Sequence, residues 1–353
     1  MPATGGTILV TGASGGLGIE IARTIATRPS DVPVHHALYT VRSTIAADKV
    51  RSVLAATISH SYDILQLDLS QLSSVRETAA AINKRVSGGE IPRIRAVVLN
   101  AGYRETGRQT WTEHGLDKTF VSNYLGHWLL TLLLLQSMNP DAGRIVVVGG
   151  MVHDPQDRSN SINKAFEEEP WQRILADASK DSVESIAKGT WAASPDDPAQ
   201  DPRELYGIRR YGGAKLFLIM MISELQCRLD SDANLNMISI LGVDPGIMPT
   251  NITVGTLNWV VRIMFSLLAR VFNLVLPNGL IRMPHKSAGD VLAAAFGTSS
   301  PIGMHPKSLY LSGDVPKEMS DEAKNAEKRT SVWRASVQYS KLRQGETCLI
   351  DWQ

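Results

Sequence analysis

Short runs of apolar, β-branched residues alternate with longer amphipathic segments along residues 7–250 of this chain. Runs of the first kind are typical of buried strands, and apolar positions that recur every three or four residues indicate helices. Because the runs are too hydrophobic for half-exposed strands, we expect helices on both faces of the sheet. The pattern predicts an α/β fold on one doubly wound parallel sheet of about seven strands. The predicted strands are 7–11, 36–41, 64–68, 96–100, 144–149, 237–243 and 307–311, and the predicted helices are 16–26, 45–56, 73–84, 113–136, 206–229 and 286–296.

Residues 151–203 break this alternation because they are polar and irregular, with the acidic run Glu167–Glu169 and several prolines near their end. A loop of this length inside a compact domain is usually functional or partly disordered. Trp171 and Trp191 make the stretch too apolar for a solvated spacer. We interpret it as an insertion within a single domain that covers residues 1–353.

A second unusual stretch, residues 256–276, is mostly apolar but contains Arg262 and Arg270. Charged side chains are costly at the centre of a bilayer, so a buried or lid-forming helix is favoured over a membrane span. The residues ahead of the first strand contain no basic leader, so we expect no signal peptide. We therefore expect a cytoplasmic location, with peripheral membrane contact through 256–276 as the alternative.

Composition narrows the classes of function. The chain has 353 residues, and 36 Lys and Arg against 35 Asp and Glu leave a formal net charge of +1. No basic surface is left over for a nucleic acid, so we expect no nucleic-acid partner. Only two cysteines, Cys227 and Cys348, are present. They cannot build a disulfide framework or a four-ligand zinc site, which indicates a reducing compartment and predicts no metal site.

A glycine-rich turn follows the first predicted strand directly and opens a helix. Such glycines allow a tight turn, let backbone N–H groups approach a pyrophosphate, and point the helix dipole at the anion. The strand–turn–helix context favours dinucleotide binding, in a Rossmann-type sheet, over a purely structural turn. The residues of this turn that we expect to contact the cofactor are Gly12, Ser14, Gly15, Gly16, Leu17 and Gly18.

The end of the second strand indicates which dinucleotide binds. Residues 38–43 contain no carboxylate, which would bind the ribose diol of NAD, but they contain Arg42. A guanidinium suits a 2′-phosphate, so we predict NADPH/NADP+, with a solvated Arg42 as the alternative. Asp68, which precedes Leu69 at the end of the third strand, is expected to contact the adenine. A capping role for its carboxylate is the alternative.

Tyr211 and Lys215 lie four residues apart at the start of a predicted helix and therefore on one face of it. A tyrosine normally keeps its proton until about pH 10. A neighbouring cation favours the phenolate and lowers the pKa, so the pair can exchange a proton near neutral pH. Together with the glycine turn, Asn100-Ala101-Gly102 after the fourth strand and Asn123 in a long helix make the pattern specific.

On these residues the chain resembles the short-chain dehydrogenase/reductase family from residue 7 to about 250. The segment Asn123-Tyr124-Leu125-Gly126-His127 is similar to the retinol-dehydrogenase-like and protochlorophyllide-reductase-like branches. The resemblance implies that Tyr211 is the general acid/base and that Lys215 holds the nicotinamide ribose and lowers the pKa of Tyr211. It implies that Asn123 fixes a water in a proton relay. It also implies cofactor contacts for Asn100, Ala101, Gly102, Pro245, Gly246 and Thr250.

The chain departs from the family pattern at two points. The family expects a Ser after the fifth strand to donate to the substrate carbonyl, and Gly150 stands there. Loss of one such donor typically costs about 100- to 1,000-fold in rate, and the neighbouring His153 and Asp154 are weak candidates to replace it. About 60 residues separate Gly150 from Tyr211, a far longer spacing than in classical members. Carbonyl reductases resemble this chain in carrying an insertion there that covers the dimer helix, so we expect a monomer.

The residues around the predicted site favour a lipophilic substrate. The substrate loop or lid of the family would cover 247–282, and Tyr103, Met151 and Met248 could line an apolar pocket. We expect an NADPH-dependent reductase of a bulky, lipophilic carbonyl compound such as a polycycle or sterol, similar to fungal reductases of secondary metabolism. One alternative is an isomerase or proton-transfer enzyme with altered chemistry at Gly150. Another is a catalytically silent NADPH-binding module.

Overall fold

One sheet of eight strands forms the centre of the fold, in the order β3-β2-β1-β4-β5-β6-β7-β8. The structure is a computed structural model that describes residues 5–27, 34–55, 61–250, 276 and 278–353. Neighbouring strands are parallel except for β7 and β8. The predicted doubly wound parallel sheet is confirmed, with one strand more than expected. The strands are β1 (Gly6–Val10), β2 (Val34–Val41), β3 (Ser61–Gln66), β4 (Ile94–Leu99), β5 (Arg144–Val148), β6 (Ser239–Asp244), β7 (Tyr310–Ser312) and β8 (Val315–Pro316).

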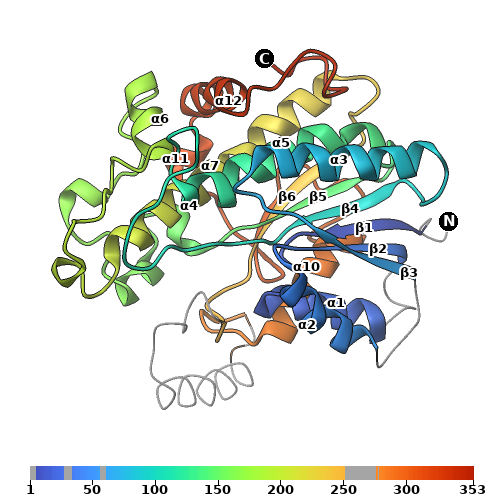
Figure 1. Ribbon diagram of the computed structural model, residues 1–353, viewed down its shortest axis with the longest axis horizontal. Coiled ribbons are helices and arrows are strands. Elements are labelled where there is room, and N and C mark those ends of the chain that lie inside the picture. Colours follow the sequence, from blue (N-terminus) through green and yellow to red (C-terminus); the bar gives the residue numbers. More distant parts are fainter. Residues whose placement is uncertain (1–4, 28–33, 56–60, 251–275, 277) are drawn as a thin grey trace.

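Helices cover both faces of this sheet (Figure 1). One face carries α1 (Gly16–Thr27), α2 (Thr44–Leu54) and α10 (Pro284–Phe296). The other carries α3 (Leu72–Ser87), α5 (Gly126–Leu134) and α7 (Leu205–Ser231), and α11 (Asp321–Lys324) and α12 (Ala326–Ser340) pack against α7. Every residue of β4, β5 and β6 is buried, as the unbroken apolar runs of these strands predicted.

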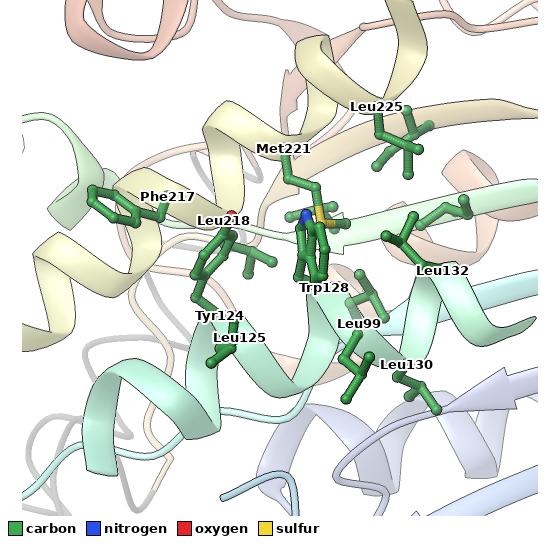
Figure 2. Packing of buried hydrophobic residues seen from close by; sticks show 14 of the residues in the cluster. Leu99, Tyr124, Leu125, Trp128, Leu130, Leu132, Phe217, Leu218, Met221 and Leu225 are labelled. Atoms are coloured by element: carbon green, nitrogen blue, oxygen red, sulfur yellow. The ribbon is translucent and has the colours of Figure 1, made fainter. Parts of the chain in front are cut away.

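The larger hydrophobic core lies between the sheet and the layer of α5 and α7. Figure 2 shows Tyr124 and Trp128 facing Phe217 and Met221 of α7. The Tyr124 and Phe217 rings meet edge to face with centroids 5.6 Å apart. Trp128 also packs edge to face on Trp333 of α12 at 5.1 Å, so the C-terminal helix is part of this core. The apolar pattern of the sequence did not predict a helix in this C-terminal region.

The long helix predicted over 113–136 begins later and is interrupted. It starts at α4 (Lys118–Phe120) because Asp117 acts as the N-cap, its carboxylate accepting a hydrogen bond from the Phe120 N–H. A π-helical turn (Val121–Leu125) separates α4 from α5, and a 3-10 turn (Leu135–Ser137) ends the segment. The predicted start at residue 113 is therefore wrong.

The insertion is not irregular throughout. It contains α6 (Lys180–Ala187), whose N-cap is Ser179, and short 3-10 turns. The rings of Trp171 and Trp191 meet edge to face at 5.4 Å, and the guanidinium of Arg209 in α7 lies 4.0 Å from the Trp171 ring centroid. The two tryptophans thus tie the insertion to the helix that carries Tyr211.

The hairpin of β7 and β8 was not predicted. A two-residue loop joins Ser312 to its partner Val315, and Gly313 in that loop has a φ of +66°. Glycine is the residue that adopts such a conformation without strain, so this turn depends on it.

The predicted lid is only partly covered by the described residues. Positions 251–275, which include most of the apolar stretch, lie outside them. Among the described helices, none is both long enough and apolar enough to cross a membrane.

Candidate functional site

A cavity of about 1180 Å³ opens at the edge of the sheet where the strands β1 to β6 end. Ligands of doubly wound sheets bind at this carboxyl edge. Tyr211, Lys215 and Gly150 line the cavity, whereas Asn123 does not. The structure thus brings together residues from six strand ends and from the helices α1, α2 and α7. The residues predicted to contact the cofactor all line it, namely Gly12, Ser14, Gly15, Gly16, Leu17, Gly18, Arg42, Asp68, Leu69, Asn100, Ala101, Gly102, Tyr211, Lys215, Pro245, Gly246 and Thr250.

The glycine turn is shaped by close approach of two backbone segments. Gly12 has a φ of +65°, and a Cβ there would lie 2.7 Å from the Ala101 Cα. A Cβ at Gly18 would lie 2.4 Å from the Gly12 carbonyl oxygen. The Asn100 side chain donates to the carbonyl oxygens of Thr11 (2.8 Å) and Gly12 (3.2 Å) and so joins the two segments. Larger residues would push the turn away from the loop after β4.

A buried hydrogen-bond network lies beneath this turn. The Thr11 hydroxyl accepts from the N–H groups of Asn100 (2.9 Å) and Ala101 (3.0 Å), and it lies 3.0 Å from His127 Nε2. His127 Nδ1 lies 3.2 Å from the Asn123 carbonyl, which can only accept. Burial, with a contribution from Lys215, lowers the pKa of His127 to about 3, so its ring is neutral. Nδ1 therefore carries the proton and Nε2 is an acceptor, so the single proton of the Thr11 hydroxyl is shared between Nε2 and the Val98 carbonyl oxygen, which lies 3.3 Å away.

The end of β2 presents cations and a helix N-terminus to the cavity. Arg42 is exposed, and its guanidinium carbon lies 5.9 Å from the Tyr103 ring centroid. Ser43 caps α2 by accepting from the Ala46 N–H. Lys49, further along α2, lines the same part of the cavity. Lys49 could not be predicted from the sequence, because only the fold shows that this side of α2 faces the cavity.

Asp68 both lines the cavity and holds a turn. Its Oδ1 accepts from the Ser70 N–H (2.9 Å) and the Ser70 hydroxyl (2.7 Å). The alternative capping role therefore applies to the turn ahead of α3, whose own N-cap is Gln71. A contact of Asp68 with adenine stays a prediction.

Tyr211 and Lys215 stand on one face of α7, with the Lys215 Nζ 5.6 Å from the Tyr211 ring centroid. Nζ donates to the Val148 carbonyl oxygen at 2.8 Å. Burial raises the pKa of Tyr211 to about 12, a shift opposed by Arg104 and assisted by Asp244. Burial also lowers the pKa of Lys215 to about 8. The expected lowering of the Tyr211 pKa is therefore not found in this structure, where loss of solvation outweighs the nearby positive charge.

The Asn123 side chain is fully buried and its polar atoms are engaged. Oδ1 accepts from the Tyr103 N–H at 2.8 Å, and Nδ2 donates to the carbonyl oxygens of Tyr103 and Thr119, both at 2.6 Å. Asn123 thus clamps the backbone of the loop that follows Asn100–Gly102. The predicted water contact of Asn123 stays a prediction.

Gly150 has a φ of +153°, which L side chains rarely adopt. A Cβ there would meet no atom of the described residues within 4 Å, so space is open and the backbone is the obstacle. The Gly150 N–H donates to the Tyr310 hydroxyl at 3.3 Å, and its carbonyl oxygen lies 2.7 Å from His153 Nδ1. His153 is buried against Tyr310 and is not a donor to the cavity, which argues against it as a replacement for the family Ser. A Gly150→Ser exchange would strain this backbone as well as add a hydroxyl.

Asp244, at the end of β6, is a site residue that was not predicted from the sequence. Asp244 is 5% exposed and lines the cavity. Its Oδ1 accepts from the Gly246 N–H at 3.0 Å, and Lys317 lies 3.5 Å from Oδ2. These contacts hold the turn at Pro245 and Gly246 in place. Asp244 could have been suspected only as a polar residue at the end of a strand.

Comparison with known proteins gives consistent matches. A family model described as short chain dehydrogenase matches residues 6–157. The "Short-chain dehydrogenase iccH" of Talaromyces variabilis is 39% identical over 370 residues, covering 99% of both chains. A protochlorophyllide reductase of Avena sativa is 26% identical over 336 residues, covering 93% of this chain and 97% of the relative. The solved structure of the angucycline C-6 ketoreductase LanV with bound NADP has a TM-score of 0.54 at 18% identity, covering 88% of this chain and 95% of that one. At that identity the last likeness shows the fold alone.

Proposed function

The chain belongs to the short-chain dehydrogenase/reductase family and is an NAD(P)-dependent oxidoreductase, and we propose that it is an NADPH-dependent reductase of a bulky, lipophilic ketone. One observation carries the proposal: the glycine turn, Arg42, Tyr211 and Lys215 all line the same cavity. This combination supports a dinucleotide with a 2′-phosphate beside a proton donor. The bound structure of the fold neighbour LanV, which contains NADP, adds support for the phosphorylated cofactor.

The residues present fit such a cofactor. The glycine turn leaves no room for a Cβ at Gly12 or Gly18, and the N-terminus of α1 faces the cavity, which suits a pyrophosphate. Arg42, Ser43 and Lys49 would hold the 2′-phosphate. When bound, the dihydronicotinamide supplies the hydride.

Tyr211 would donate the proton to the nascent alkoxide. With its pKa raised to about 12, the phenol is protonated at neutral pH, the form that reduction requires. Oxidation of an alcohol would need the phenolate, which burial disfavours. Lys215, fixed by its bond to Val148, would orient the cofactor beside the phenol.

Apolar side chains form part of the cavity wall. Met151, Val152 and Ile162 come from the insertion, Ile208 from α7, and Met248 from the loop after β6. A bulky, lipophilic carbonyl compound fits such walls better than a small polar one. The fold neighbour LanV is a ketoreductase, which supports the class of reaction that we propose here.

Cofactor specificity tests the proposal. We expect a fluorescence titration to show tighter binding of NADPH than of NADH, and Arg42→Leu to weaken NADPH binding about tenfold or more with NADH unchanged. Arg51→Leu, on the exposed face of α2, is the matched control and should change neither. Equal affinities for the two nucleotides in wild type, or an unaffected Arg42→Leu, would contradict the NADPH assignment.

Tyr211→Phe tests the proton donor. We expect NADPH oxidation with a panel of lipophilic ketones to fall by about 100- to 10,000-fold while the NADPH affinity stays the same. An unchanged turnover would exclude Tyr211 as the acid. Tight NADPH binding with no turnover of any ketone in wild type would favour the silent binding module.

A further inference from the structure

A short corner of the chain, Tyr103–Glu105, is held rigidly beside Tyr211. Asn123 clamps the Tyr103 backbone through both its N–H and its carbonyl oxygen. The Glu105 carbonyl packs on α7 at Gly207, where a Cβ would lie only 2.3 Å from the Glu105 oxygen. Gly207 precedes Tyr211 by one helical turn. Arg104, between these two fixed points, therefore has a defined place on the cavity wall.

The guanidinium of Arg104 has few partners. Arg104 lines the cavity, and its Nε is buried without a hydrogen-bond partner among the described residues. Within that part of the chain, its one charged contact is Glu204 Oε2, 3.8 Å from Nη2, which is too long for a hydrogen bond. The structural arginine Arg144 differs, because its terminal nitrogens donate to four backbone carbonyl oxygens. The terminal nitrogens of Arg104 make no hydrogen bond among the described residues, so they can donate to an acceptor that enters the cavity.

The cavity wall at Gly150 lacks a side-chain donor. Gly150 has no side chain there, and its N–H is already bound to the Tyr310 hydroxyl. The electrostatic influence of Arg104 reaches the Tyr211 phenol, where it opposes the increase in pKa caused by burial. A substrate oxygen near Tyr211 would therefore lie within the field of the Arg104 cation.

We propose that Arg104 binds an acidic oxygen of the substrate, so that the substrate is a lipophilic ketone with a carboxylate or an acidic enol close to the reacting carbonyl. A guanidinium binds such oxygens through two parallel N–H groups. Glu204 balances the charge of Arg104, and an anionic substrate would displace this long contact. This inference rests on the proposed ketone reductase, and it names the class of substrate that the site selects.

Binding of a matched pair of ketones tests the inference. The probes are 2-benzoylbenzoate and its methyl ester, titrated calorimetrically into the protein with and without saturating NADP+. We expect wild type to bind the carboxylate on the order of tenfold or more tightly than the ester, and Arg104→Gln to reduce this preference to within about twofold. Arg108→Gln, an exposed position in the same loop outside the cavity lining, should keep the wild-type preference.

A second variant tests the same inference without changing Arg104. Glu204→Gln removes the competing carboxylate and should strengthen binding of the carboxylate probe while leaving the ester unchanged. The inference is overturned if the wild-type protein does not prefer the carboxylate probe over the ester, which includes binding neither probe. It is also overturned if the Arg104→Gln variant keeps the wild-type preference for the carboxylate. NADPH titrations of each variant separate the two proposals. A carboxylate preference without NADPH binding would leave Arg104 in its role and refute the proposed reductase.

Discussion

Alanine at Gly12 should destabilise the protein for two separable reasons. The first is conformational, because Gly12 has a φ of +65°, and a left-handed backbone costs a residue with a Cβ about 1–2 kcal/mol. The second is steric, because the new Cβ would lie 2.7 Å from the Ala101 Cα and 2.9 Å from its Cβ. Overpacking of this kind typically costs about 1–3 kcal/mol. We expect Gly12→Ala to lose about 2–5 kcal/mol if the two effects add.

Two control positions isolate each effect. Gly89 has a φ of +72° but a Cβ there would meet no atom of the described residues within 4 Å, so Gly89→Ala should show the conformational cost alone. Gly18 has no positive φ, but its Cβ would lie 2.4 Å from the Gly12 carbonyl oxygen and 2.8 Å from the Ala13 Cα. Gly18→Ala should therefore show the steric cost alone, against backbone atoms that cannot move aside cheaply.

Thermal unfolding and NADPH titration together provide the assay. A loss of 1 kcal/mol lowers the melting temperature of a large domain by about 2–4 °C, so the three variants should separate clearly. Gly12→Ala and Gly18→Ala should also weaken NADPH binding at least about tenfold, because each new Cβ displaces the backbone of the turn. Gly89→Ala should bind NADPH as wild type does. Equal melting temperatures for Gly12→Ala and Gly89→Ala would refute the argument that the approach to Ala101 constrains the turn.

Three further substitutions test charge and packing. Because burial lowers the pKa of Lys215 from 10.5 to about 8, the unfolded chain binds more protons between those values and wild-type stability rises with pH there. Lys215→Met should therefore melt above wild type at pH 7, with a difference that shrinks toward pH 10.5, and a constant difference would contradict burial as the cause. Arg210→Met leaves the Asp117 carboxylate, now 3.2 Å from Arg210 Nε, buried without its cation, and should cost about 3–5 kcal/mol in urea unfolding. A loss under about 1 kcal/mol would mean that water reaches Asp117. Trp333→Ala should lower the free energy of unfolding by about 3–5 kcal/mol, because Trp333 is buried. Trp111 is 54% exposed, so Trp111→Ala should lower it far less. Equal losses would argue against α12 as part of the core.

The chemistry-bearing residues could be recognised from the sequence where their spacing is local. The glycine turn can be recognised because its residues are consecutive in the sequence. Tyr211 and Lys215 can be placed on one helix face because they lie four residues apart. The central strands β4, β5 and β6 could be predicted because burial on both faces demands apolar runs. The helix start at Lys118 was missed because Asp117, the residue that caps it, lies inside a segment whose apolar spacing continues on both sides.

Other features depend on residues that meet only after folding. Arg104, Glu204, Asp244 and Lys49 line the cavity although nothing in their local sequence distinguishes them from solvated surface residues. The tautomer of His127 follows from the hydrogen bonds that Thr11 and Asn123 offer from distant segments.

The fold class, the dinucleotide-binding turn and the Tyr–Lys pair could be predicted from the order of the residues, because periodicity and short spacing are properties of neighbouring residues. The protonation of that pair, in contrast, depends on the folded chain. A lysine four residues from a tyrosine predicts a lowered phenol pKa. In the folded chain, however, burial raises the pKa of Tyr211, and Lys215 donates its hydrogen bond to the Val148 carbonyl oxygen. Solvation depends on everything that packs around a group, and no local pattern contains that information.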